Sequence, residues 1–214
     1  LKRGETLGII GATGAGKTTI VNLLMRFYDA DQGVVRIDGK DVRTMGLHDL
    51  RKRFGTVFQN DTIFEDTIME NINMGRELSE EAVMEAVLYG RASEFVEEKG
   101  GISAQLDIKG ANLSGGQKQR ILIARALAAK PDILILDDSS SALDYKTDAA
   151  LRKELREHFA ETTCVIIAQR ISSIMNSDHI MVLEDGQMIG YGTHQELMET
   201  CEIYREIGKS QMGI

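Results

Sequence analysis

GATGAGKTT, residues 11–19, lies between the apolar run Thr6–Ile10 and a helical pattern that starts after Lys17. This is the spacing G-x-x-x-x-G-K-T, in which glycines let the backbone wrap around phosphate oxygens while the following helix points its N-terminus at the negative charge. Lys17 is expected to reach the β- and γ-phosphates of a nucleotide, and the Thr18 hydroxyl to ligate Mg²⁺. The predicted phosphate-binding residues are Gly11, Thr13, Gly14, Ala15, Gly16, Lys17, Thr18 and Thr19.

Helical and apolar segments alternate along much of the chain. We expect a helix over Gln117–Lys130, stopped by Pro131, then a strand over Ile133–Leu136, a helix over Thr147–Phe159 and a strand over Thr163–Ala168. Strands separated by helices indicate a parallel sheet that is covered on both faces, with ligands at the carboxyl ends of its strands.

Other segments indicate additions to this parallel sheet. Asp38-Gly39 and Asp185-Gly186 each stand between apolar or alternating arms, which predicts two hairpins. Ser79–Glu98 reads as a helix of a separate lobe, and Thr193 with Glu196 predicts a capping box that opens a last helix, Gln195–Ile207. The predicted fold is an α/β phosphate-loop NTPase with a mixed, mainly parallel sheet, a small antiparallel part and a helical lobe.

Two further motifs carry chemistry. The strand over Ile133–Leu136 delivers Asp137 at its C-terminal end, where the carboxylate suits Mg²⁺, reached through water. LSGGQ, residues 113–117, offers a hydroxyl and unobstructed backbone amides at the start of a helix, a second phosphate-facing arrangement. Its candidate binding residues are Ser114, Gly115, Gly116 and Gln117.

The composition excludes several classes of protein. A length of 214 residues with 43% hydrophobic residues suits one large globular domain, and a net charge of -8 disfavours a nucleic-acid surface. Two cysteines cannot build a disulfide framework, which favours a reducing compartment. No apolar run reaches the roughly 20 residues of a membrane-spanning helix. The start, without methionine or signal peptide, suggests a piece of a longer polypeptide.

Over nearly its full length the chain resembles the nucleotide-binding domain of an ATP-binding cassette transporter of the exporter type. The segments that carry the resemblance are MRFYDADQGVVRIDGKDVR (25–43), LRKRFGTVFQ (50–59), ANLSGGQKQR (111–120), SSALD (140–144) and DHIMVLEDGQMIGYGTHQEL (178–197). The resemblance implies one domain, 1–214, with a catalytic core of about 1–59 and 131–214 and a helical lobe of about 60–130. It also implies that the domain is truncated at its N-terminus, follows a transmembrane domain in a longer chain, and lies on the cytoplasmic face of the cell membrane.

The same resemblance implies ATP and Mg²⁺ as cofactors and a second nucleotide-binding domain as partner. The two domains would stack head to tail, so that each ATP lies between one domain's phosphate loop and the other's LSGGQ. Gln59 would touch Mg²⁺ or the attacking water, and Asp144 would act across the dimer interface. The stretch Asn60–Ile72 would receive helices from the transmembrane domain, with Phe64 and Ile68 either as contacts or as core residues. The adenine-stacking aromatic residue would lie upstream of Leu1.

The chain departs from the family pattern at positions aimed at the γ-phosphate. Asp138 stands where the family has the glutamate that polarises the attacking water, and a carboxylate one methylene shorter should often miss its proton. Gln169 replaces a histidine that contacts the γ-phosphate, and a neutral amide cannot become cationic. Together these changes resemble the non-hydrolysing half of a heterodimeric exporter. Ile108 stands in place of a glutamate before LSGGQ, which resembles the signature motif of the family, and this change also puts one coupling contact in doubt.

Three other functions stay open. A fully active homodimeric ATPase that tolerates aspartate would show substantial turnover that a Lys17→Ala change abolishes. A DNA-repair or chromosome-maintenance ATPase also joins a phosphate loop to a signature motif, but separates them by long coiled coils. A small-molecule kinase would leave LSGGQ and SSALD without explanation. By the same resemblance, the transported substrate would be chosen by membrane helices outside the chain.

Overall fold

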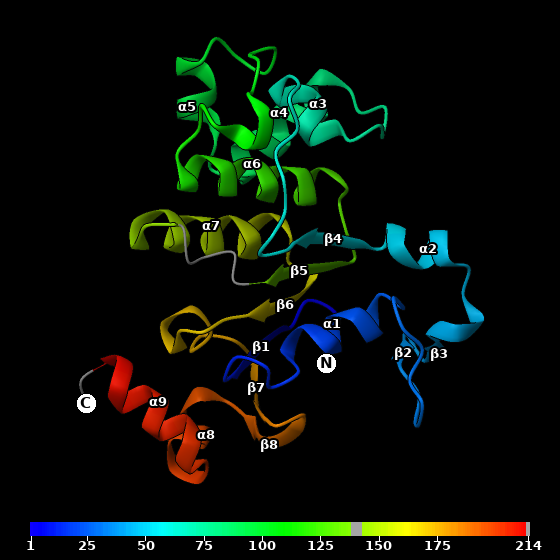
Figure 1. Cartoon of the computed structure of the whole chain (residues 1–214), viewed down its shortest axis with the longest axis vertical. Coiled ribbons are helices and arrows are strands. Elements are labelled where there is room, and N and C mark those ends of the chain that lie inside the picture. Colours follow the sequence, from blue (N-terminus) through cyan, green and yellow to red (C-terminus); the bar gives the residue numbers. More distant parts are fainter. Residues whose placement is uncertain (138–142, 213–214) are drawn as a thin grey trace. The chain divides into compact units, whose positions relative to one another are not determined.

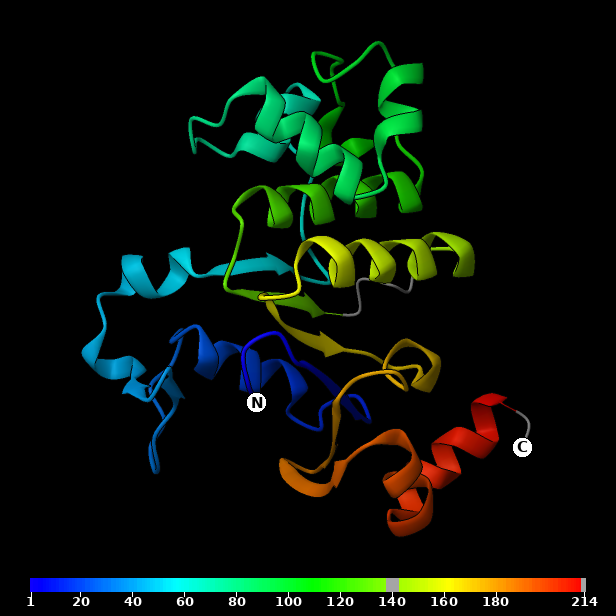
Figure 2. The same cartoon turned by 180° about the vertical axis from the view of Figure 1, so that it is seen from behind.

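A computed structural model describes residues 1–137 and 143–212 of the chain. These residues cluster into two units, the first formed by Leu1–Phe54 with Thr163–Ile214 and the second by Gly55–Thr162. Each unit is described by itself below. Figures 1 and 2 show the elements from opposite sides.

The first unit is built on the strand that precedes the glycine-rich loop. β1 (Thr6–Gly11) lies between β6 (Thr163–Ile167) and β7 (His179–Glu184) and pairs with both in parallel. β8 (Gln187–Gly192) pairs antiparallel with β7 at the edge. Buried residues on these strands form the core, among them Ile9, Ile10, Val165, Ile180 and Val182. The prediction of a mixed, mainly parallel sheet is confirmed.

Both predicted hairpins form at their Asp-Gly pairs. β2 (Arg36–Ile37) and β3 (Lys40–Asp41) make a separate two-stranded antiparallel sheet. Asp38 and Gly39 have φ of 50° and 76° in its turn, and Asp185 and Gly186 have φ of 45° and 77° between β7 and β8. Positive φ at both central residues matches the right-handed twist of the flanking strands, which is why Asp-Gly predicts such turns.

The remaining elements of the first unit are helices. The α-helices are α1 (Lys17–Leu24), α2 (Leu47–Lys52), α8 (His194–Thr200) and α9 (Glu202–Met212), and the 3₁₀ turns are η1 (Val42–Thr44) and η3 (Ile171–Ser173). The predicted capping box opens α8, since Thr193 Oγ1 accepts from Glu196 N–H at 3.3 Å. The single predicted last helix is wrong, because Cys201 is extended (φ −111°, ψ 108°) and separates α8 from α9. This break lets both Cys201 and Tyr204 be buried.

The second unit is mainly helical. Its helices are α3 (Ile68–Asn73), α4 (Glu80–Tyr89), α5 (Ser93–Glu98), η2 (Ile108–Gly110), α6 (Gly115–Ala128) and α7 (Tyr145–His158), and its strands are β4 (Phe54–Val57) and β5 (Ile133–Asp137). Ser79 caps α4 as predicted. The predicted continuous helix is interrupted at Gly90, whose Cβ would lie 2.9 Å from both Ala124 Cβ and Arg120 O on α6. Gly90 therefore lets the end of α4 pack closely on α6, and the left-handed φ of Arg91 (58°) breaks the helix before α5.

The segment before α3 is fixed to α6 by a half-buried arginine. Arg125 donates to the carbonyls of Asn71 at 2.6 Å and Thr62 at 3.0 Å, and burial lowers its pKa. Asn71 is buried, and its side-chain amide exchanges hydrogen bonds with both main-chain groups of Phe64. Of the predicted membrane-domain contacts, Phe64 is 49% exposed, whereas Ile68 is fully buried and belongs to the core.

Candidate functional site

The glycine-rich loop has a backbone that its sequence makes possible. Gly14 and Gly16 have φ of 85° and 98°, a conformation that L side chains rarely adopt. At Gly11 a Cβ would lie 2.2 Å from the carbonyl oxygen of Leu183, so the strand end can carry no side chain there. The β7–β8 turn supports the loop, because Gly186 N–H donates to the carbonyl of Ala15 at 3.2 Å. The glycine-rich loop is thus supported by β7 and by the turn that follows it.

The start of α1 suits an anion. Its N-cap residue Gly16 provides no side-chain cap, and no acidic residue stands in the first turn, so the positive end of the helix dipole is not neutralised there. Lys17 Nζ donates to the carbonyls of Gly11 at 2.7 Å and Ala12 at 2.8 Å, which holds its ammonium group at the loop. Ala15 is buried, while Thr13, Gly14, Thr18 and Thr19 are exposed. Open glycine backbone, an ammonium and a helix N-terminus together fit the phosphates of a nucleotide.

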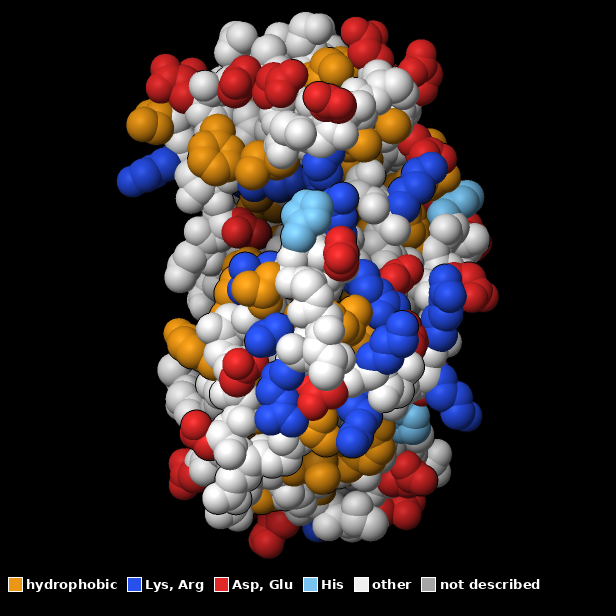
Figure 3. Space-filling model, turned by 90° about the vertical axis from the view of Figure 1, so that its right-hand side faces the viewer, with side chains coloured by type: hydrophobic (Ala, Val, Ile, Leu, Met, Phe, Trp, Pro, Cys, Tyr) orange, Lys and Arg blue, Asp and Glu red, His pale blue; other side chains and the backbone are white. Residues whose placement is uncertain are grey.

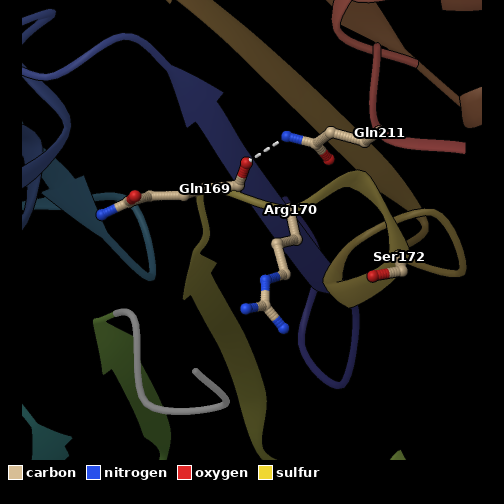
Figure 4. Close-up of a pocket in the computed structure, with 4 residues that line it drawn as sticks. All are labelled: Gln169, Arg170, Ser172 and Gln211. Atoms are coloured by element: carbon tan, nitrogen blue, oxygen red, sulfur yellow. Dashed lines mark hydrogen bonds between the residues drawn. The ribbon is translucent and has the colours of Figure 1, made fainter. Parts of the chain in front are cut away.

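Gln169 lies at the same sheet edge as the loop. Ile9 of β1 pairs with Ile167 of β6 in parallel register, so Gly11 and Gln169 each follow that pair by the same number of residues. A cavity of about 530 Å³ is lined by Gln169, Arg170, Ser172 and Gln211 (Figure 4). The structure therefore brings the loop and Gln169 together within the first unit, as parallel strands should.

In the second unit the LSGGQ residues start α6. Ser114 is the N-cap, and its hydroxyl accepts from Gln117 N–H at 3.2 Å while Gln117 Oε1 accepts from Ser114 N–H at 2.9 Å. This capping box gives Ser114 and Gln117 a structural role at the helix start. At Gly115 a Cβ would meet nothing within 4 Å, so this position has room for a side chain.

The predicted carboxylates lie on separate elements of this unit. Asp137 is the last residue of β5 and is 7% exposed. Asp144 is the N-cap of α7, and the hydroxyl and N–H of Thr147 donate to it at 2.7 and 3.0 Å, which lowers the pKa of that carboxyl. Asp138, the predicted general base, lies outside the described residues.

Gln59 follows β4 in an exposed turn. The turn is closed by Asp61, whose carboxylate accepts from Phe58 N–H at 2.8 Å. Among residues 1–137 and 143–212, no group of three or more histidine, cysteine or acidic side chains is placed to hold a metal ion. The residues predicted for Mg²⁺ (Thr18, Gln59 and Asp137) comprise a hydroxyl, an amide and a carboxylate, which are the oxygen donors that Mg²⁺ prefers.

Basic side chains gather on one face of the first unit. Figure 3 shows Lys and Arg side chains on the side that carries α2 and the β2–β3 hairpin, and the exposed ones there are Arg36, Lys40, Arg43 and Lys52. Arg43 pairs with Asp41 at 2.8 Å and Arg53 with Asp38 at 2.5 Å, so neighbouring carboxylates offset part of this charge. The absence of a nucleic-acid partner stays a prediction.

Sequence reasoning missed Gln211 and Arg125. Gln211 bonds to residues about 40 positions earlier in the chain, and no motif marks it. Arg125 lies inside a predicted helix, where the sequence shows only that it interrupts an apolar run. Its hydrogen bonds to the segment before α3 are visible only in the structure. Neither had a local signal that could have identified its partners.

Comparisons with known proteins show which family the chain is similar to. A model of the family described as "ABC transporter" matches residues 1–141. The chain is 42% identical over 214 residues to an ATP-dependent lipid A-core flippase of Methylobacillus flagellatus, covering 99% of this chain and 37% of that protein. It is 44% identical over 211 residues to the uncharacterized ABC transporter ATP-binding protein YfiB of Bacillus subtilis, covering 98% and 36%.

A solved structure is also similar. The bacterial Atm1-family ABC exporter with ATP bound superposes with a TM-score of 0.93 at 36% identity, covering 97% of this chain and 37% of that chain. This likeness confirms the predicted phosphate-loop NTPase fold. The chain thus spans little more than a third of the length of these relatives. In the part of the chain that the structure describes, no helix is long and apolar enough to cross a membrane.

Proposed function

Because the chain belongs to the ABC transporter family, we propose that it is the ATP-binding and ATPase motor domain of an exporter. The observation that carries this proposal is the open phosphate loop, with left-handed glycines, the Lys17 ammonium and an uncapped helix start. ATP with Mg²⁺ is the ligand that this chemistry suits. The bound metal would neutralise charge that develops on the phosphate oxygens.

The proposed roles rest on the chemistry of these side chains and on the resemblance to the family. Lys17 holds the β- and γ-phosphates, and Thr18, Asp137 and Gln59 hold Mg²⁺, Asp137 through water. Gln59 also orients the attacking water. The phosphate loop binds the α- and β-phosphates through its amides.

Hydrolysis at this chain's own site is proposed to be slow. Asp138 should fall short of the proton it must take, and Gln169 donates to the γ-phosphate without a positive charge. The LSGGQ residues Ser114, Gly115, Gly116 and Gln117 are intact, and Asp144 would act beside them across the interface. This combination supports a heterodimer in which the chain holds one ATP and completes the partner's competent site.

The coupling surface is proposed around Asn60–Ile72. Phe64 is exposed there, and the hydrogen bonds of Arg125 tie this segment to α6, the helix that starts with the signature. A movement of a transmembrane domain against this segment would therefore be transmitted to LSGGQ through α6. The domain would work on the cytoplasmic face of the membrane, with a catalytic core of about 1–59 and 131–214 and a lobe of about 60–130.

Replacing Lys17 tests the nucleotide site. Charge-assisted hydrogen bonds contribute about 1.5–3 kcal/mol each, so Lys17→Ala should weaken binding of ATP with Mg²⁺ by about 10- to 100-fold. Titration calorimetry on the chain would measure this dissociation constant. Lys40→Ala removes the same charge from the exposed β2–β3 hairpin and should leave the dissociation constant for ATP unchanged. Equal ATP binding by wild type and Lys17→Ala would count against the proposed site.

A further inference from the structure

The end of α9 reaches back to the segment that contains Gln169. Gln211 Nε2 donates to the main-chain carbonyl of Gln169 at 2.7 Å, and Gln211 Oε1 accepts from the main-chain N–H of Ile171 at 2.8 Å. One side-chain amide therefore bridges main-chain groups on both sides of Arg170. Figure 4 shows the first of these bonds beside the cavity.

Ile171 needs an acceptor because it begins η3. The first N–H groups of a helix have no partner within the helix, and a capping side chain normally accepts from them. Arg170 is the N-cap residue here, but it makes no side-chain cap, and a guanidinium has only donors. Gln211 supplies the acceptor from another helix. A primary amide can do this and donate to the Gln169 carbonyl at the same time.

Both partners of this bridge are anchored elsewhere. On one side, Ala168 N–H donates to the carbonyl of Ile9 at 3.1 Å, and Ile171 is fully buried. On the other, α9 is held by Tyr204, which is fully buried and lies 2.8 Å from His194 Nδ1 through its hydroxyl. The bridge therefore joins two fixed elements, and it sets the position of the main-chain carbonyl of Gln169, which lies between Ala168 and Ile171 in the chain.

We propose that Gln211 is a positioning residue that holds Gln169 so that its side-chain amide faces the γ-phosphate. This rests on the role given to Gln169 in the proposed function. Gln211 bonds to the carbonyl of Gln169, and in Figure 4 the side chain of Gln169 points away from Gln211. The end of α9 thus acts on the nucleotide site through main chain. Only a nucleotide with a γ-phosphate should sense it.

The test compares ATP with ADP. Gln211→Leu removes both hydrogen bonds at similar side-chain size, and should weaken ATP binding to the chain by about 3- to 10-fold while the dissociation constant for ADP stays unchanged. Lys209→Ala, an exposed change on the same helix, should leave both constants unchanged. Thermal melting shows whether each variant is folded. Should Gln211→Leu fail to fold, Gln211→Glu keeps the acceptor for Ile171 and places a carboxylate against the Gln169 carbonyl, with the same expected loss for ATP.

Repeating the test in a Gln169→Ala variant shows whether Gln211 acts through Gln169 or only supports the structure in general. In Gln169→Ala, the Gln211→Leu change should no longer alter ATP binding, because residues that act through one another are not additive. Equal losses for ATP and ADP, no loss, or an undiminished loss in Gln169→Ala would each overturn the proposal. If wild type binds neither nucleotide, the proposed function fails and this inference with it. If wild type binds ATP but Gln211→Leu does not change the ratio of the dissociation constants for ATP and ADP, this inference fails and the proposed function stands.

Discussion

A Gly115→Asp variant is expected to lower ATP turnover of the assembled complex by about 10²- to 10³-fold, the loss typical of removing one preorganised donor at a reacting anion. In the proposed heterodimer, LSGGQ of this chain faces the γ-phosphate of the partner's competent site. A carboxylate at that helix start would repel the phosphate and cover the amide. The chain itself should fold normally, because a Cβ at Gly115 meets nothing within 4 Å and a negative charge suits a helix N-terminus.

Two matched variants sharpen this result. Gly115→Ala adds a small neutral side chain in the same open space and should cost far less turnover than the aspartate. Lys17→Ala disables this chain's own site, so the competent site should keep most of the turnover of the complex. Phosphate release at saturating ATP measures all three. A larger loss from Lys17→Ala than from Gly115→Asp would contradict the assignment of the fast site to the partner.

In the Gly115→Asp background, adding Asp138→Glu is expected to raise the residual turnover by about 10²-fold, since loss of a positioned base costs 10²- to 10⁴-fold. With the competent site slowed, a rise in the residual rate caused by Asp138→Glu reports this chain's own site. The added methylene brings the carboxylate within reach of the attacking water. Asp49→Glu makes the same extension on an exposed side chain and should change nothing.

One result of the Asp138→Glu experiment would contradict the proposed role of this carboxylate. An unchanged residual rate would mean that the reach of Asp138 does not limit hydrolysis. Adding Gln169→His would then show whether the missing positive charge at the γ-phosphate is limiting instead. If Gln169→His restores turnover and Asp138→Glu does not, the slow hydrolysis is caused by Gln169 rather than by Asp138.

Local chemistry explains which parts of the fold could be predicted. The Asp-Gly turns, the Thr193 capping box and the Ser79 cap each depend on a few neighbouring residues, and each forms as predicted. The strand before Gly11 could be found because its apolar run ends at a glycine-rich loop. Sequence reasoning therefore succeeds where an interaction spans only a few positions.

The errors come from interactions across longer distances. The continuous helix predicted over Ser79–Glu98 ignores the contact of Gly90 with α6, and the single last helix ignores the burial of Cys201. The sequence leaves Ile68 open as a contact or a core residue, and only the packing shows that it is core. The site residues Gly11, Lys17 and Gln169 could be named from motifs and resemblance. Gln211 could not, because its partners are set by how α9 packs.

The central claim is that this chain holds ATP at a slow site and completes a fast one on its partner. Its most direct test is ATP turnover of the chain alone and of the same amount of chain assembled with its partner. The account predicts slow turnover alone and a rate about 10²-fold higher per chain in the complex. Equal rates per chain in both samples would contradict it.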